Sequence, residues 1–403
     1  MKVYKYPGTT ALNALLTRPS VNRRAIRNTV SRIMDRVRSG GDEAIAFYAR
    51  QFDRNPPSEG KLDKYLKKAI KTAYSHIRKF HLAQKHDSEP IETVAGVRCW
   101  RKYLPIESVG LYVPGGSAPL FSTVLMLGVP AQIAGCKEII LCSPSDHPAI
   151  KFAAGLCGIT KIFRVGGAQA IAAMGYGTET IPPVKKIFGP GNNYVTIAKQ
   201  ILQAETVAID MPAGPSELLV IADDSAIPEF VAADLLSQAE HAEDAQVILV
   251  TTSNRILESV RQQISLQVRD LPRRKITTGS LNNCRLVLVK NLDQAIAISN
   301  AYAPEHLILA CKNISKQIRN AGSVFIGNYS PESAGDYASG TNHVLPTGGY
   351  AYAYSGISVD SFLKSISFQS ISKKGLRQLG PTIMRMAEEE GLEAHKRAVK
   401  IRL

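Results

Sequence analysis

The sequence predicts an α/β protein in which two successive domains each contain a parallel β-sheet covered by helices. From about Ser108 onward, short β-branched runs alternate with helical patterns, as they do in βαβ units. The runs fall into two series of five, which indicates two domains of similar design. The length of 403 residues exceeds what one hydrophobic core usually supports, and 45% hydrophobic with 21% charged residues is typical of a soluble globular protein.

The strands of the first series are predicted at 109–113, 138–142, 161–165, 184–188 and 206–210. Glycine-containing turns end three of them, at 113–119, 165–170 and 188–192. A helix that follows such a turn offers free backbone N–H groups to a phosphate. No turn matches G-x-G-x-x-G or a Walker loop, and glycine is common there for steric reasons, so each turn alone is weak evidence. Together they would line the carboxyl edge of the sheet, where open α/β sheets bind ligands.

The strands of the second series are predicted at 217–222, 246–251, 285–289, 306–310 and 323–327. The first hundred residues have helical patterns with a break at 55–57, and the chain returns to helix after about Ser355, ending in a helix from Met384 to Val399. These patterns divide the chain into a helical N-terminal region, a first α/β domain, a second α/β domain and a C-terminal helical segment, at residues 1–105, 106–211, 212–350 and 351–403.

The formal net charge of +15 raises the alternative of a nucleic-acid-binding protein. Residues 1–100 hold 20 Lys and Arg against 9 Asp and Glu, so most of the excess is local. Its basic residues alternate with apolar ones at helical spacing, as on the solvated faces of amphipathic helices, and no nucleic-acid-binding motif accompanies them. We therefore expect no nucleic-acid partner, although a basic flank would also attract an anionic dinucleotide.

Targeting and redox signals predict a cytoplasmic protein without a membrane partner. No apolar run approaches the roughly 20 residues of a membrane helix, and Met1 to Leu16 lacks the features of a secretory signal. The six cysteines have no CxxC spacing and mostly lie in apolar segments, as buried free thiols do. We expect neither a disulfide framework nor a cysteine-based zinc site.

The polar stretch from Ser330 to Thr347 is the strongest candidate for a functional loop. It places Glu332, Asp336, Asn342 and His343 among small residues and lacks the apolar periodicity of an ordinary helix or strand. Carboxylate and imidazole groups on a glycine-spaced loop suit a metal ion or a polar ligand. The alternative is a solvated turn whose Asp and Asn side chains cap the backbone.

Two further constellations favour a ligand site over that alternative. Gln238 and His241 lie three residues apart at the end of a helical pattern and should share one helix face. Glu305 and His306 are adjacent at the entrance of a predicted strand. A single histidine beside an apolar run is usually structural, but three such groups within about a hundred residues indicate a site with acid–base or metal chemistry.

Seven motifs in this order, from about Arg98 to the C-terminus, resemble the histidinol dehydrogenase family: VGLYVPGG, KIFGPGN, MPAGPSELLVIAD, LLSQAEH, APEHL, ESAGDYASGTNHVLPT and EGLEAHKRAV. The resemblance implies oxidation of L-histidinol to L-histidine through L-histidinal, the last steps of histidine biosynthesis, with NAD and one zinc ion per site. It also implies a homodimer. Each chain would have two Rossmann-like but incomplete domains and small helical domains at both ends, and the C-terminal segment would contribute to the partner's site.

The resemblance also implies which residues bind. The zinc ligands would be Gln238, His241, Asp336 and His395. NAD contacts would come from Tyr112, Gln169 and Asn192. Substrate contacts, besides the metal ligands, would come from Ser216, His306, His343 and Glu390. General chemistry would prefer Glu240 to Gln238 as a zinc ligand, but the resemblance overrules it.

The residue types fit the implied chemistry. An imidazole with a pKa near 6.5 can take the hydroxyl proton as hydride leaves, so His306 is the expected base, and Glu305 beside it is expected to activate water for the second oxidation. Zinc is expected to anchor the substrate more than to ionise it. A thiohemiacetal on Cys136 or Cys142 is disfavoured, because neither has an adjacent base. A zinc hydrolase that needs no dinucleotide remains the alternative enzyme.

Overall fold

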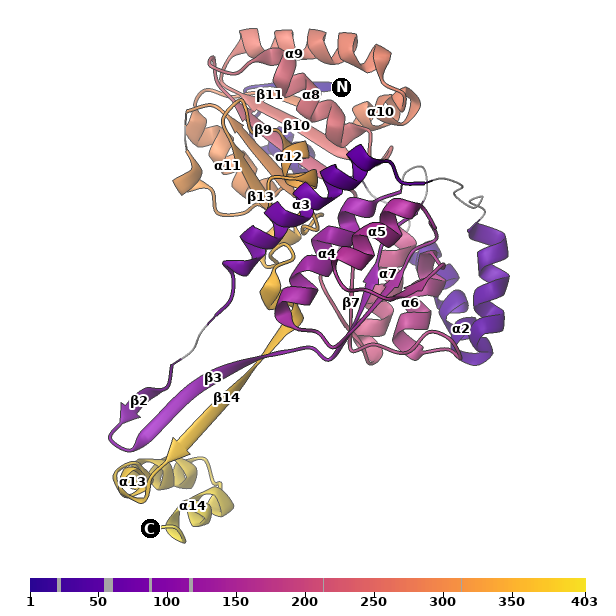
Figure 1. Ribbon diagram of the computed structural model, residues 1–403. Coiled ribbons are helices and arrows are strands. Elements are labelled where there is room, and N and C mark those ends of the chain that lie inside the picture. Colours follow the sequence, from indigo (N-terminus) through magenta and orange to yellow (C-terminus); the bar gives the residue numbers. More distant parts are fainter. Residues whose placement is uncertain (20–22, 54–60, 87–88, 116–118, 213, 313) are drawn as a thin grey trace.

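The computed structural model describes residues 1–403 except 20–22, 54–60, 87–88, 116–118, 213 and 313. It contains two parallel sheets and one antiparallel sheet, and Figure 1 shows two α/β lobes from which a long arm extends. The predicted α/β class with two parallel-sheet domains is confirmed. Within the described residues, no helix is both long and apolar enough to cross a membrane.

The first domain has five parallel strands in the order β6-β5-β4-β7-β8. The helices α4 and α5 lie with α3 on one side of this sheet, and α6 and α7 lie with α2 on the other. The strands are β4 (Ser108–Tyr112), β5 (Glu138–Cys142), β6 (Lys161–Phe163), β7 (Lys186–Phe188) and β8 (Ala208–Ile209). The helices are α2 (Arg23–Phe52), α3 (Lys64–Leu82), α4 (Phe121–Ala134), α5 (Pro148–Leu156), α6 (Gly167–Tyr176) and α7 (Asn193–Glu205).

The second domain has six parallel strands in the order β1-β11-β10-β9-β12-β13, with buried β-branched side chains on both faces as parallel sheets require. The helices α8 and α9 cover one face, and α1 and α11 cover the other. The strands are β1 (Lys2–Lys5), β9 (Glu217–Ala222), β10 (Gln246–Thr251), β11 (Arg285–Leu288), β12 (His306–Ala310) and β13 (Ser323–Ile326). The helices are α1 (Thr9–Leu16), α8 (Pro228–Ala239), α9 (Asn254–Gln267), α10 (Arg274–Ser280), α11 (Leu292–Tyr302) and α12 (Glu332–Tyr337).

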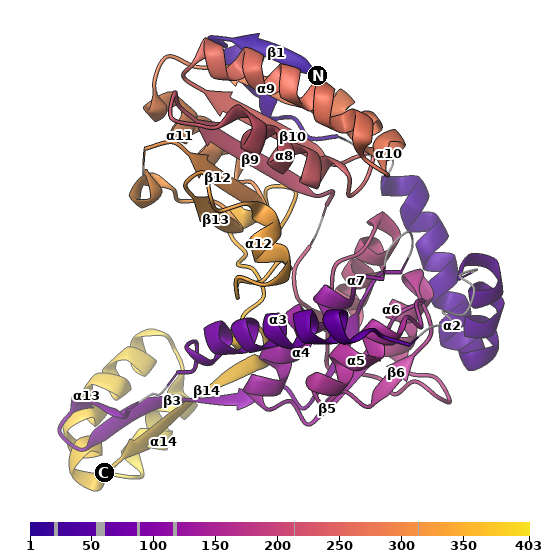
Figure 2. The same cartoon turned by 45° about the horizontal axis from the view of Figure 1, so that its top comes forward.

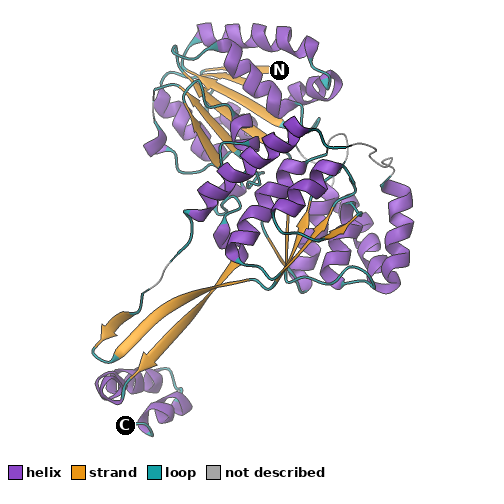
Figure 3. Cartoon of the chain, viewed as in Figure 1, coloured by secondary structure: helices purple, strands orange, loops and turns teal. Residues whose placement is uncertain are grey.

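The arm is built from strands that the sequence analysis did not predict. β14 (Leu363–Ile371) pairs along its whole length with β3 (Val97–Pro105), antiparallel, and β2 (Ile91–Val94) completes the sheet. The arm extends away from both lobes and ends in α13 (Lys373–Glu389) and α14 (Glu393–Lys400) (Figure 3). The prediction of helix directly after Ser355 is therefore wrong. Most side chains of β14 are exposed, so the segment carries little apolar periodicity.

Two further predictions about helices need correction. The continuous helix from Met384 to Val399 is wrong, because Gly391, with φ of +71°, separates α13 from α14. Region 1–105 contains the helices α1, α2 and α3, but also β1, β2 and β3. β1 carries mostly exposed side chains at a sheet edge, so its sequence gives no strand signal. The predicted break at 55–57 lies outside the described residues.

Short 3₁₀ turns complete the chain: Val268–Asp270, Leu281–Asn283, Ser315–Gln317, Tyr350–Tyr352 and Val359–Phe362. The chain passes between the lobes more than once. β1 and α1 belong to the second lobe, α2 to α7 to the first, and β9 to α12 to the second again, as Figure 2 shows. The two parallel sheets are thereby held on either side of a shared cavity.

Candidate active site between the two lobes

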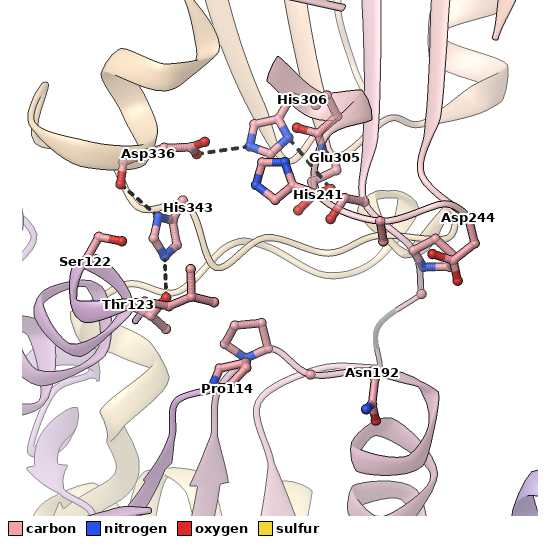
Figure 4. A pocket seen from close by; sticks show the side chains of 18 of the residues that line it. Pro114, Ser122, Thr123, Asn192, His241, Asp244, Glu305, His306, Asp336 and His343 are labelled. Carbon is pink, nitrogen blue, oxygen red and sulfur yellow. Dashed lines mark hydrogen bonds and ion pairs between the residues drawn. The ribbon is translucent and has the colours of Figure 1, made fainter. Parts of the chain in front are cut away.

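A cavity of about 350 Å³ lies between the two parallel sheets (Figure 4). The first domain contributes residues from the segments after β4 and β7, and the second contributes residues from the start of β9, the end of α8, the start of β12 and the α12 loop. Of the predicted site residues, the cavity brings together Asn192, Ser216, Gln238, His241, Glu305, His306, Asp336 and His343.

The predicted pair Glu305 and His306 lies at the amino end of β12, as expected. Both side chains are buried, at 7% and 4% exposure, yet both line the cavity. The Nδ1 atom of His306 lies 3.7 Å from Oε2 of Glu305 and 3.3 Å from the carbonyl oxygen of Glu217. Its Nε2 atom lies 3.7 Å from Oδ1 of Asp336 and has no hydrogen-bond partner among the described residues. One ring nitrogen is thus held by the backbone, while the other is buried beside Asp336 without a hydrogen-bond partner among the described residues.

Burial and neighbouring charges shift the protonation of this pair. Burial raises the pKa of Glu305 to about 8, even though His306 opposes the shift. Burial alone would lower the pKa of His306, but the carboxylates of Glu305, Asp336 and Glu332 outweigh it and raise that pKa to about 10. The ordinary value near 6.5 assumed from the sequence is therefore wrong for this arrangement, because three carboxylates surround the imidazole.

Asp336 and His343 line the cavity beside His306. The Nδ1 atom of His343 donates to the backbone carbonyl of Asp336 at 2.9 Å, and its Nε2 atom lies 3.1 Å from Oγ1 of Thr123 on α4. Burial raises the pKa of Asp336, but the imidazoles of His306, His343 and His241 hold it below its usual range. Asp336 therefore presents a carboxylate to the cavity at neutral pH.

Gln238 and His241 both reach the cavity, but they do not share one helix. α8 ends at Ala239, so His241 follows the helix, with its Nδ1 atom donating to the carbonyl of Ser237 at 3.0 Å. The amide of Gln238 is buried. In the amide orientation in which both the nitrogen and the oxygen have hydrogen-bond partners, the nitrogen donates to Glu332 at 2.5 Å and the oxygen accepts from the N–H of Glu217 at 3.2 Å. The Gln238 amide would have to exchange one of these bonds to bind a metal.

The first domain contributes a rigid turn. Oδ1 of Asn192 caps α7 by accepting from the N–H groups of Tyr194 and Val195 at 3.0 and 3.2 Å. Gly189, at the start of this turn, has φ of +129°, donates its N–H to Asp210 at 2.8 Å and accepts from Nζ of Lys199 at 3.0 Å. The buried pair of Lys199 and Asp210 thus fixes the turn that presents Asn192.

Two predicted NAD contacts, Tyr112 and Gln169, do not line the cavity. Their exposures are 4% and 1%, and they lie beneath the turn that precedes α6. The N–H groups of that turn are already used, because Gly166 donates to Asp53 at 3.0 Å and Gly167 donates to the hydroxyl of Tyr112 at 3.0 Å. This turn follows the carboxyl end of β6, as predicted, but the N–H groups of Gly166 and Gly167 are not free donors there.

Glu390 and His395 lie at the end of the arm. Both are exposed, and neither lines the cavity. Figures 1 and 2 both place α13 and α14 away from β12 and α12, so these side chains do not reach the cavity of their own chain. Glu390 caps α13 and His395 belongs to α14, so they do not lie on one continuous helix as the sequence analysis expected.

The donors within one chain fit part of a zinc site. The imidazole of His241, the carboxylate of Asp336 and the amide of Gln238 line one cavity, and imidazole and carboxylate are ordinary zinc ligands. The described residues contain no group of three or more His, Cys, Asp or Glu side chains able to hold a metal ion. A fourth donor such as His395 would have to come from elsewhere.

The cysteine alternative finds no support in the geometry. Neither Cys136 nor Cys142 lines the cavity. Burial raises the pKa of the Cys136 thiol to about 11 and that of Cys142 further still, so neither is a reactive thiolate at neutral pH.

Several cavity residues escaped the sequence analysis. Ser122 and Thr123 begin α4, directly after the first glycine turn, and Asp244 and Tyr337 extend two of the predicted motifs. Their only sequence signal is proximity to these motifs, because small hydroxyl side chains are common at helix starts. The network around Glu217 was also missed, since a Glu at the start of an apolar strand reads as an ordinary strand end.

Comparisons with known proteins agree with the motifs. The sequence model of the family "Histidinol dehydrogenase" matches residues 16–403. A histidinol dehydrogenase of Bacteroides thetaiotaomicron is 53% identical over all of this chain and 99% of its own length, and the chloroplastic enzyme of Arabidopsis thaliana is 50% identical over all of this chain and 91% of its own length. The crystal structure of histidinol dehydrogenase from Elizabethkingia anophelis has a TM-score of 0.94 and 51% identity, covering 100% of this chain and 98% of that one.

The family match over nearly the whole chain, the full-length identities near 50% and the close agreement of the folds lead to one conclusion. The chain belongs to the histidinol dehydrogenase family, oxidoreductases of histidine biosynthesis.

Proposed function

We propose that this protein oxidises L-histidinol to L-histidine through L-histidinal, using two NAD and one zinc ion per site. The observation that carries the proposal is the buried pair of Glu305 and His306 in a cavity that also contains His241, Asp336 and His343. A base, a carboxylate and candidate metal donors within one cavity between two α/β lobes are what this chemistry requires. The family assignment supports the substrate.

His306 is the proposed base in both oxidations. Its side chain lines the cavity and its Nε2 atom has no hydrogen-bond partner among the described residues, so Nε2 would take the hydroxyl proton while hydride passes from the alcohol carbon to NAD. The acidic side chains of Glu305, Asp336 and Glu332 raise the pKa of the imidazole in the free protein. A cation beside Asp336, such as the ammonium group of histidinol, would offset these carboxylates and lower the pKa of His306 toward neutrality.

Glu305 is proposed to deprotonate the water that adds to the aldehyde. The hydrate formed carries a new hydroxyl group, and loss of its hydride to a second NAD yields the carboxylic acid. The raised pKa of Glu305 makes it a stronger proton acceptor than an ordinary carboxylate. Its burial beside His306 also keeps bulk water away, so that the added water is the one that reacts.

Gln238, His241 and Asp336 would hold the zinc ion together with His395 from a second copy of the chain. Bound there, zinc would fix the substrate's amino and imidazole nitrogens rather than ionise its alcohol. Ser216 and His343 line the same cavity and would complete the substrate contacts, with Glu390 from the second copy. Asn192 would contact NAD. Tyr112 and Gln169 are buried beneath the turn that precedes α6, so they would affect NAD binding by holding that turn.

The position of the arm supports a homodimer with shared sites, which we propose. The end of the arm carries His395 and Glu390 beyond reach of their own cavity, and the exposed apolar side chains there, Met386 on α13 and Leu392 just before α14 among them, suit contact with another chain. We also propose a cytoplasmic enzyme without a nucleic-acid partner, since the basic residues of 1–100 lie largely on solvated helix faces.

The first test is NADH formation from L-histidinol before and after chelation. We expect two NADH per histidinol, loss of activity on metal removal and recovery with zinc. A zinc hydrolase would turn over its substrate without NAD, and a nucleic-acid-binding protein would bind unrelated DNA with steep salt dependence and contain no zinc. Absence of NADH with the zinc-loaded protein would refute the proposed reaction.

The second test concerns the shared site. His395→Ala and Glu305→Ala, each inactive alone, are mixed under conditions that allow subunit exchange. If the terminal helix acts in its partner, a heterodimer regains one intact site, and random mixing restores about a quarter of wild-type activity. A mixture that stays inactive, although native mass spectrometry shows heterodimers, would mean that the helix serves its own chain.

A further inference from the structure

Arg18, just beyond α1, reaches the first strand of the active-site edge. Its Nε donates to Oε1 of Glu217 at 2.5 Å and its Nη2 donates to Oε2 at 3.1 Å. The side chain of Glu217 is 2% exposed and that of Arg18 is 22% exposed. This bidentate, largely buried ion pair joins the N-terminal segment to the first residue of β9, about two hundred positions later.

The partners of this pair hold it in one geometry. The guanidinium of Arg18 lies 4.0 Å from the ring centre of Tyr302, and its Nη2 also donates to the carbonyl of Tyr302 at 2.5 Å. Tyr302 is itself fully buried, and its hydroxyl donates to Gln246 at 2.7 Å. On the other side, the N–H of Gly348 donates to Oε1 of Glu217 at 3.0 Å. The carboxylate of Glu217 therefore has partners on both oxygens.

The backbone of Glu217 contacts both residues of the catalytic pair. Its N–H donates to Oε2 of Glu305 at 2.8 Å, and its carbonyl accepts from Nδ1 of His306 at 3.3 Å. The second contact places the proton of a neutral His306 on Nδ1, which leaves Nε2 as the nitrogen with a lone pair for the substrate. One residue thus orients the carboxylate of Glu305 and selects the tautomer of His306.

We propose that Arg18 and Glu217 are positioning residues for the oxidation. The ion pair fixes the start of β9, and the backbone of Glu217 then holds Glu305 and His306 in the reactive orientation. This inference rests on the proposed function, because it assigns the pair's role through Glu305 and His306. Neither Arg18 nor Glu217 lines the cavity, so they act through the cavity residues that the backbone of Glu217 contacts: Glu305 and His306, and Gln238, whose amide oxygen shares the N–H of Glu217 at the longer distance of 3.2 Å.

The simpler reading is that the pair only anchors the N-terminal segment. The chain offers a matched control in Arg38, which also lies in that segment, pairs with Glu205 at 3.0 Å and lies 4.3 Å from the ring centre of Tyr176. Arg38→Ala removes the same kinds of interaction from a site on α2, away from the cavity. An anchoring role would make the two Arg→Ala variants alike.

The experiment measures both oxidations in Arg18→Ala, Arg18→Lys, Glu217→Gln and Arg38→Ala. We expect kcat to fall about tenfold to a hundredfold in Arg18→Ala, with the KM values for histidinol and NAD changed less than about threefold. Guanidinium at millimolar concentration should restore part of this kcat by occupying the vacated position beside Glu217, and urea should not. Arg18→Lys and Glu217→Gln should lie between wild type and Arg18→Ala, and they carry the test if Arg18→Ala does not fold.

Crystal structures of the wild type and of the best-folded Arg18 or Glu217 variant separate this inference from the proposed function. We expect the contacts of Glu217 with Glu305 and His306 to lengthen or break in the variant, whatever the substrate is. If the wild type forms no NADH from histidinol, the proposed function fails while the structures still decide the positioning role. Unchanged contacts, or a kcat that falls no further in Arg18→Ala than in Arg38→Ala and does not respond to guanidinium, would overturn the proposal.

Discussion

The two parallel sheets face the cavity with opposite edges. The first presents the carboxyl ends of β4 and β7, where α7 begins at the cavity with Asn192 as its cap. The second presents the amino ends of β9 and β12, where α8 ends at the cavity with Gln238 and His241. A helix start offers N–H donors and positive potential, and a helix end offers carbonyl groups and negative potential.

This difference assigns each lobe a type of ligand. The edge of the first domain suits an anion such as the phosphates of a dinucleotide. The edge of the second domain adds the carboxylate of Asp336, whose pKa is held below its usual range, to the negative end of α8, and so it suits a cation such as zinc or the ammonium group of histidinol. We propose that the two domains, although similar in design, divide cofactor and substrate because their sheets are used from opposite ends.

The largest expected effect lies in the second domain. His306→Asn should slow both oxidations by about 10² to 10⁴-fold, because it removes the base for both hydroxyl protons. Glu305→Gln should slow the aldehyde-to-acid step more than the alcohol-to-aldehyde step. Single-turnover NADH yields from histidinol and from histidinal measure this. Equal losses on both substrates in the Glu305 variant would contradict the assignment to water activation.

A control for these variants lies in the first domain. His147→Asn exchanges one capping side chain of α5 for another and is remote from the cavity. Its rates on both substrates should stay within about twofold of wild type, since N-caps contribute to stability and not to this site.

The division between cation and anion edges can be tested by binding. Asp336→Ala or His241→Ala should lower zinc content and histidinol affinity together and leave NAD binding nearly unchanged. Asn192→Ala should do the reverse, weakening NAD binding about threefold to tenfold while zinc content stays the same. Metal analysis and calorimetric titration of both ligands check this. Histidinol binding of unchanged strength in metal-free protein would show that zinc does not anchor the substrate.

The two parallel sheets and the antiparallel sheet of the arm differ in how well the sequence predicted their strands. The runs EIILC, ELLVIA, QVILVT and HLILA have the same bounds in the structure as in the sequence analysis, because buried parallel strands are continuously apolar. β3 and β14 pair with each other across more than 250 positions, β14 exposes both faces and β3 is mostly half-buried, so no local pattern indicates them.

Site prediction shows a similar contrast. Glu305 and His306 came from polar residues placed against an apolar run, Asp336 and His343 came from a polar stretch without apolar periodicity, and the fold brings all four together. Tyr112 and Gln169 came from the resemblance alone, and their burial beneath a turn depends on Asp53, whose contact with Gly166 joins positions over a hundred residues apart. Such contacts depend on the packing of α2 against the first domain, which local sequence does not encode.

A smaller effect concerns the turn of the first domain. Gly189→Ala would place a Cβ against the carbonyl of Tyr112 at a φ of +129°, so we expect a loss of about 2–4 kcal/mol in the free energy of unfolding and a raised KM for NAD. Gly135→Ala, at φ of +87° with open space around its Cβ, should cost about 1 kcal/mol and leave both KM values unchanged. Denaturant unfolding and steady-state kinetics compare the two, and a KM effect on histidinol alone would contradict the division of ligands.

The smallest effect concerns Asp234 on α8, behind the negative edge. Burial raises its pKa to about 7, above the value of about 4 in an unfolded chain. The folded protein thus holds this proton more tightly, and the stability falls as pH rises from about 4 to about 7. Asp234→Asn should remove this loss and raise Tm by about 2 °C at pH 8 but not at pH 4. The exposed Asp270→Asn serves as the control, and equal shifts in both variants would contradict the burial argument.

The edge strand β1 has a consequence for the order of folding during synthesis. Lys2 pairs with Arg285, so β1 waits for partners that are made roughly 15–60 s after it at ordinary translation rates. The first domain, whose sheet is complete by Ile209, can form while the second still lacks β10, β11, β12 and β13. In nascent chains of this enzyme, β1 therefore stays unpaired after the first domain has folded. The ion pair of Arg18 and Glu217 can form only once β9 has been made.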